Sequence, residues 1–80
     1  MFNQTPLPEL LHAARTAAAT LGLRYCPVVI RDEATAHRIA ARQRAGCVML
    51  GENAYWVVCL ADADRLDSAG YEWAPSLAAQ

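Results

Sequence analysis

The residues of this chain that could do chemistry are first of all its three cysteines. Cys26, Cys47 and Cys59 lie in strand-like runs of aliphatic and aromatic residues. A cysteine nucleophile needs a neighbouring base and an electropositive, partly exposed setting, and a zinc site needs paired spacing such as Cys-x-x-Cys. The sequence shows neither pattern. We therefore expect three buried free thiols in a reducing compartment.

Other catalytic and ligating patterns are also missing from the sequence. His12 has no second histidine or cysteine three or four residues away, which is typical of a solvated surface histidine. There is no glycine-rich phosphate loop, no nucleophile elbow and no His-Glu-x-x-His motif. We expect a protein that is not an enzyme and that uses no metal or cofactor.

The charged residues are distributed unevenly, although the net charge is only −1. A basic segment contains four arginines against two acids: Arg31, Arg38, Arg42 and Arg44. A later acidic segment contains five acids against one arginine: Glu52, Asp62, Asp64, Asp67 and Glu72. Such runs often form solvated faces. The functional alternatives are an acidic patch that docks on a basic groove built for nucleic acid, and a basic helix that contacts phosphate or an acidic partner.

Aromatic residues are numerous for a core of this size. Tyr55 and Trp56 lie in an apolar run and are expected in the core, whereas Tyr71 and Trp73 follow the acidic segment. Aromatic side chains are common anchors of protein interfaces. We therefore predict Tyr71 and Trp73 as candidate partner-binding residues beside the acidic patch.

The strongest structural signal is a hairpin over residues 47–60. Two apolar runs flank Gly-Glu-Asn, and the symmetric register places Leu50 opposite Tyr55 and Met49 opposite Trp56. Side chains alternate across a strand, so both faces of this hairpin are apolar and Cys47 and Cys59 point to opposite faces. The sheet must then be covered on both sides, by its own helices or on one side by another molecule.

The remaining elements follow from periodicity and from capping residues. An apolar stripe predicts a helix that opens at Thr5-Pro6 or Leu7-Pro8 and ends at Gly22. A strand over 24–30, with Pro27 favouring a sheet edge, precedes a helix over 32–45. A short helix follows the hairpin and stops at Gly70.

These elements predict one small α+β domain spanning residues 1–80. The order is α-β-α-β-β-α, with a three-stranded mixed sheet whose C-terminal hairpin is packed by helices. The first two strands are expected to run parallel through a crossover helix. Residues 1–5 are predicted to be a lead-in and residues 75–80 a loose tail. The sequence shows no secretory signal and no run long enough to span a membrane, which favours the cytoplasm.

The segment AYWVVCLADADRLDSAGYEWAP, residues 54–75, resembles the C-terminal ends of short prophage and plasmid reading frames. Together with the small α+β domain, the polarised charge and the alanine and arginine bias, it resembles the small anti-CRISPR proteins of phages and mobile elements, including inhibitors of type I-C systems. That resemblance implies stoichiometric inhibition in the host bacterial cytoplasm. The partner would be a Cascade-type CRISPR-Cas surveillance complex, whose recruitment of target DNA is blocked.

On that hypothesis the acidic patch supplies charge complementarity, and Tyr71 or Trp73 supplies buried area. No direct binding to nucleic acid is expected. Two alternatives stay open. One is a small dimeric regulator or nucleic-acid-binding module that uses the arginine-rich helix, and the other is a structural subunit whose open sheet face is covered by a second copy.

Overall fold

The computed structural model describes residues 5–43 and 46–74, which form three helices and four strands. In chain order they are α1 (Leu7–Leu21), β1 (Val28–Ile30), α2 (Glu33–Arg42), β2 (Gly46–Leu50), β3 (Tyr55–Cys59), α3 (Leu60–Ser68) and β4 (Glu72–Trp73). The predicted α+β class is confirmed. None of the described helices is long and apolar enough to cross a membrane.

The four strands form one antiparallel sheet in the order β1-β3-β2-β4. The prediction of a three-stranded mixed sheet is therefore wrong. β1 and β2 do run in the same direction, since both are antiparallel to β3, but β3 lies between them and they do not pair. The crossover pattern indicates strand direction, and it does not exclude a third strand inserted between the two.

The predicted hairpin register is confirmed pair by pair, including Leu50 opposite Tyr55 and Met49 opposite Trp56. The turn closes with a 2.9 Å hydrogen bond from the Gly51 N–H to the Ala54 carbonyl. Asn53 adopts a positive φ of 61°, which asparagine tolerates better than most residues. Local turn chemistry and the alternation of apolar residues thus specify this part of the fold.

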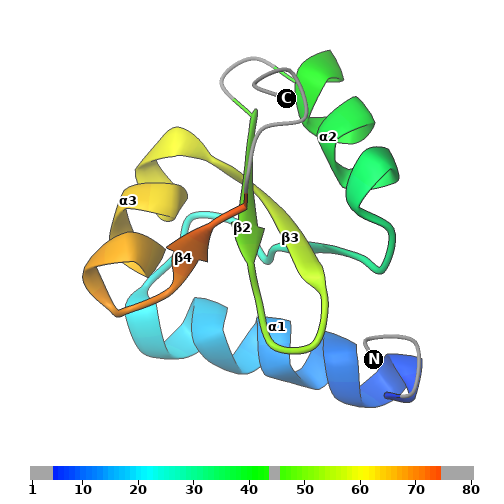
Figure 1. Ribbon diagram of the computed structural model, residues 1–80. Helices are drawn as coiled ribbons and strands as arrows, with labels where there is room; N and C mark the ends of the chain where they lie inside the picture. The colour runs from blue at the N-terminus through cyan, green and yellow to red at the C-terminus, as the bar shows by residue number, and fades with distance from the viewer. Residues whose placement is uncertain (1–4, 44–45, 75–80) are drawn as a thin grey trace.

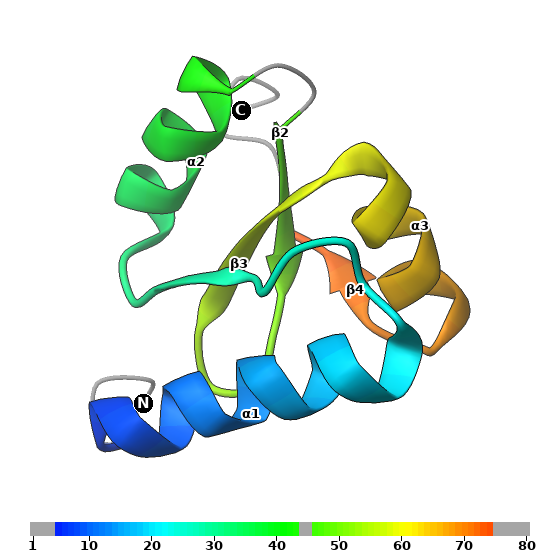
Figure 2. The same ribbon diagram turned by 180° about the vertical axis from the view of Figure 1, so that it is seen from behind.

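Helices cover both faces of the sheet, so the molecule has three layers. Figures 1 and 2 show α2 on one side of the sheet and α3 on the other, with α1 lying across one end. The first core cluster joins strand residues to α1 and α3: Met49, Trp56, Val58, Ala14, Ala17, Ala63 and Leu66. The second joins strand residues to α2: Val48, Val57, Ala36 and Ala40.

Of the two possibilities that the sequence left open, the structure shows the first, because helices of this chain pack on both apolar faces of the sheet. The hypothesis of a structural subunit required an open sheet face that a second copy would cover. The described part of the chain presents no such face, because each cluster is closed by a helix.

Two predicted caps are present. The Asp32 carboxylate accepts hydrogen bonds from the Thr35 N–H at 2.8 Å and from the Thr35 hydroxyl at 2.6 Å, which fixes the start of α2. Gly22 has a left-handed φ of 67° and ends α1, and the Leu23 N–H returns to the Ala18 carbonyl at 3.0 Å. Both helices therefore begin or end where the sequence signals place them.

Other predictions about the elements need correction. β1 begins only at Val28, so Cys26 lies before the strand and is exposed rather than buried. β4 was not predicted, because two residues carry no periodic signal. The prediction that the second helix extends to residue 45 is wrong, because α2 ends at Arg42 and Gln43 already has an extended backbone. Most of the lead-in predicted over residues 1–5, the tail predicted over residues 75–80 and Arg44 lie outside the described residues.

Candidate functional site

The exposed acids of α3 share one side of the helix. Asp64 and Asp67 are exposed and one turn apart, while the helix buries Ala63 and Leu66 against the sheet. Leu60 precedes them at the spacing i, i+4, i+7, which places all three on a common side. Leu60 is 50% exposed. This side of α3 therefore presents two carboxylates next to an apolar side chain.

Trp73 on the edge strand β4 extends this surface. It pairs with Met49, whose side chain packs toward α3, so Trp73 lies on the same face of the sheet. α3 packs directly against β4, and Trp73 remains 43% exposed. We call the four residues Leu60, Asp64, Asp67 and Trp73 the acidic-aromatic surface.

The environment of Cys47 indicates where the Asp64 carboxylate lies. Burial raises the pKa of the Cys47 thiol, and the charges of Cys59 and Asp64 raise it further. Cys47 and Trp73 occupy the same face of the sheet on neighbouring strands. The Asp64 carboxylate is therefore close enough to Cys47 to affect its thiol, and the Asp64 side chain also lines the hollow between α3 and the end of α1.

Asp62 was predicted to belong to the acidic patch, and this is wrong. The residue is completely buried, and its two carboxylate oxygens accept hydrogen bonds from the Arg24 N–H at 2.8 Å and the Tyr25 N–H at 3.1 Å. Its position four residues before Leu66 is a signal that could have placed it on the buried side of the helix. Asp62 therefore connects the segment after α1 to α3 through hydrogen bonds, and its buried carboxylate is not accessible to a partner.

Tyr71 and Glu52 interact with each other. The Tyr71 hydroxyl donates a 2.9 Å hydrogen bond to the Glu52 carboxylate, and the Tyr71 ring lies 5.3 Å from the Trp56 ring at an angle of 32°. Burial and this hydrogen bond both raise the pKa of Tyr71. The pair ties the tip of the hairpin to the segment between α3 and β4, so Tyr71 acts as a structural contact more than as an exposed anchor.

Glu72 is exposed on β4 but does not share the face of Trp73. Adjacent residues of a strand point to opposite sides, and Glu72 pairs with Leu50, which belongs to the α2 side of the sheet. The five predicted acids thus fall into three groups. Asp64 and Asp67 flank the exposed apolar residues, Glu52 and Glu72 border the β4 edge, and Asp62 is interior.

The basic residues lie in the opposite layer of the molecule. Arg38 and Arg42 are exposed on α2, one turn apart, on the far side of the sheet from α3. Arg31 is exposed too, but its guanidinium donates a 2.8 Å hydrogen bond to the Thr5 carbonyl. Arg44 falls outside the described residues. The two exposed arginines of α2 and the two exposed acids of α3 therefore lie in layers separated by the sheet.

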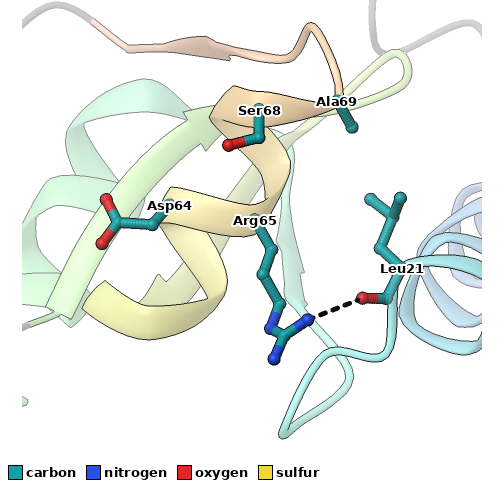
Figure 3. A pocket seen from close by; sticks show the side chains of 5 residues that line it. All are labelled: Leu21, Asp64, Arg65, Ser68 and Ala69. Atoms are coloured by element: carbon teal, nitrogen blue, oxygen red, sulfur yellow. Dashed lines mark hydrogen bonds between the residues drawn. The ribbon is translucent and has the colours of Figure 1, made fainter.

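A shallow hollow of about 510 Å³ lies beside the acidic-aromatic surface, where α3 and the end of α1 meet. Figure 3 shows Arg65 reaching from α3 toward Leu21, whose carbonyl accepts a 3.5 Å hydrogen bond from the guanidinium, while Asp64 points away from Arg65. Arg65 thus neutralises the carbonyl end of α1 and does not pair with Asp64. The side chains of Asp64 and Ser68 add the other polar groups of the wall.

Among the described residues, no group of three or more His, Cys, Asp or Glu side chains is placed to hold a metal ion. In comparisons with known proteins, no protein family, no curated protein and no solved structure matches this chain. The candidate surface is therefore interpreted from its own residues.

Proposed function

We propose that this chain is a non-enzymatic inhibitor that binds a CRISPR-Cas surveillance complex and blocks recruitment of target DNA. The acidic-aromatic surface would dock on the basic surface of the complex that admits the DNA. The observation that supports this most is that the exposed Asp64 and Asp67 follow the exposed Leu60 along one side of α3, and that α3 packs against β4, which carries the exposed Trp73. The target is proposed from the resemblance of residues 54–75 to anti-CRISPR proteins.

Physical chemistry favours this use of the surface. Exposed carboxylates gain little from one another in water, but opposite a basic groove they speed association and occupy positions meant for phosphates. Trp73 supplies the desolvated contact that charge alone does not provide, since aromatic residues dominate interface energetics. A rigid helix and a paired strand hold both features, so little ordering entropy is lost on binding.

The layered distribution of charge also bears on the orientation of binding. The arginines of α2 lie on the other side of the sheet and would face away from a basic groove. The same groove would repel them if the molecule docked the other way round. The proposal therefore specifies one orientation, with α3 and β4 toward the complex.

An order-of-addition gel-shift experiment tests the proposal. A purified type I-C surveillance complex is mixed with its target duplex, and the chain is added either before or after the DNA. We expect prior addition to abolish the shifted band and later addition to have little effect. The chain alone should not shift the duplex.

Matched variants connect the result to the surface. Asp64→Lys with Asp67→Lys should restore the shift, whereas Arg38→Glu with Arg42→Glu, an equal number of charge reversals in the other layer, should inhibit like the parent. Normal DNA binding by the complex in the presence of the parent chain would refute the proposed target. Inhibition by both double variants would refute the proposed surface.

A second candidate function rests on α2. Arg38 and Arg42 are exposed on one side of that helix, a spacing that allows both to contact phosphates of a nucleic acid. A regulator of this kind would bind DNA or RNA by itself, with an affinity that falls steeply as salt rises. Direct titration of labelled DNA and RNA at two salt concentrations distinguishes it from the inhibitor.

A further inference from the structure

A second hollow, of about 300 Å³, contains two thiols. Its wall includes Cys26, before β1, and Cys59, at the end of β3. Gln43, directly after α2, also lines it, so the hollow begins where α2 ceases to cover the sheet. The hollow thus brings together two cysteines that are 33 positions apart in the chain.

The register of β1 and β3 explains why the two cysteines meet. The paired residues of β1 end at Val28, opposite Val57, and the same antiparallel register extended by two more residues would bring position 26 opposite position 59. Residues two apart along extended chain point to the same face, here the face covered by α2. Opposed Cα atoms of antiparallel strands are about 4.5–5.5 Å apart. Disulfides typically span about 4.4–6.8 Å between Cα atoms, so residues opposed in that register are within bridging range.

The third cysteine is placed differently. Cys47 pairs with Val58 and belongs to the opposite face of the sheet, among the residues that pack toward α3. Burial raises the pKa of its thiol, which lowers the fraction of reactive thiolate. Cys26 is exposed and Cys59 is half-buried in the wall of the hollow. A small thiol reagent therefore reaches Cys26 first and finds Cys59 as its neighbour.

We propose that Cys26 and Cys59 form a dithiol modification site that reacts with low-molecular-weight disulfides of the glutathione type. In the first step the Cys26 thiolate attacks one sulfur of the reagent, forms a mixed disulfide and releases one thiol. In the second step the Cys59 thiolate attacks the Cys26 sulfur and releases the second thiol. The two cysteines lose two electrons and two protons in total, and the reagent is reduced to two thiols.

The resulting bond would connect the chain before β1 to the residue that precedes α3. Cys59 is the N-cap residue of α3, so the bridge would fasten the start of that helix to the sheet edge. A disulfide that closes a long loop restricts the unfolded chain and thereby raises stability. The oxidised protein should therefore unfold at a higher temperature than the reduced protein.

The test treats the folded, reduced chain with oxidised glutathione and analyses it by intact mass spectrometry after alkylation. We expect loss of two hydrogens, with no glutathione retained on the product. Cleavage after arginine and glutamate then separates Cys47 from Cys59, because Glu52 lies between them. Peptide 25–31 should remain linked to peptide 53–65 until a reductant is added.

Variants make the outcome decisive. Cys59→Ser should stop at a stable glutathione adduct on Cys26, while Cys47→Ser should form the disulfide at the rate of the parent. The proposal is overturned if the parent retains glutathione on Cys26, links Cys26 to Cys47, joins two copies, or does not react. A melting temperature that is equal or lower after oxidation would overturn the predicted stabilisation.

Discussion

Replacement of Asp62 by alanine offers the sharpest test of how α3 is fixed to the molecule. The buried carboxylate accepts hydrogen bonds from the backbone N–H groups of Arg24 and Tyr25, at 2.8 and 3.1 Å. Removing it leaves two donors without their acceptor, and each such donor costs about 1–3 kcal/mol when buried. The side chains of Arg24 and Tyr25 are exposed, so water can reach this segment. The cost of each donor therefore falls in the lower half of that range, about 1–2 kcal/mol. We expect a loss of about 2–4 kcal/mol.

That loss is large relative to the whole protein. A chain of this length has a free energy of unfolding of about 4–12 kcal/mol. Asp62→Asn keeps one acceptor oxygen and should lose roughly half as much as Asp62→Ala. Asp64→Ala is the matched control, because it makes the same change two residues away on the exposed side of α3. Like Asp62→Ala, the Asp64→Ala substitution raises helix propensity, but it removes neither hydrogen bond. Its effect on the free energy of unfolding should therefore stay within about 0.5 kcal/mol.

Urea unfolding followed by tryptophan fluorescence measures these differences, since Trp56 is completely buried. Hydrogen exchange of the Arg24 and Tyr25 amides provides a local readout, and both should exchange faster in Asp62→Ala than in Asp64→Ala. If the free energy of unfolding of Asp62→Ala lies within about 0.5 kcal/mol of the parent value, as it does for a typical surface substitution, the proposed anchoring role of the carboxylate is wrong.

Three further predictions concern the turn, a cap and a tyrosine. Gly51→Ala should lower the free energy of unfolding by about 1–3 kcal/mol in the same urea assay, because the added Cβ would collide with the buried Trp56 ring. An unchanged midpoint of the urea transition would contradict the predicted collision. Asp32→Ala should lower the melting temperature at neutral pH. The difference should begin to shrink as the pH falls toward 3.8 and should disappear only below the folded pKa of Asp32, which hydrogen bonds from Thr35 hold below that ordinary value; a difference independent of pH would refute the cap. The free energy of unfolding should fall as the pH rises above 10, because burial and the Glu52 hydrogen bond raise the pKa of Tyr71 in the folded protein, so the tyrosine ionises first in the unfolded chain. In melting curves at alkaline pH, Tyr71→Phe should show a smaller fall. An equal fall in both proteins would contradict the assignment to Tyr71.

Local chemistry explains which parts of the fold could be predicted from the sequence. The hairpin register, the Asp32 cap and the end of α1 at Gly22 depend on residues close together in the chain, and all three are confirmed. The insertion of β3 between β1 and β2 depends on contacts between distant segments, which periodicity does not encode. β4 is too short to carry a pattern and exists because it pairs with β2.

The same distinction applies to the candidate surface. Composition alone groups all the acids of residues 52–72 together, but helix geometry separates buried Asp62 from exposed Asp64 and Asp67. The alternation of β4 places Trp73 and Glu72 on opposite faces. The sequence therefore indicated a candidate segment, and only the tertiary arrangement shows which of its residues are exposed and which are buried.

The central proposal is tested most directly by measuring the affinity of the chain for a purified type I-C surveillance complex by biolayer interferometry. Trp73→Ala should weaken binding about 30-fold, the equivalent of about 2 kcal/mol for an interface anchor. Asp64→Lys with Asp67→Lys should weaken it at least about 10-fold and reduce its dependence on salt, while Arg38→Glu with Arg42→Glu should bind like the parent. Loss of binding in the α2 variant with parental affinity in the α3 variant would contradict the account and place the interface on the arginine-bearing layer.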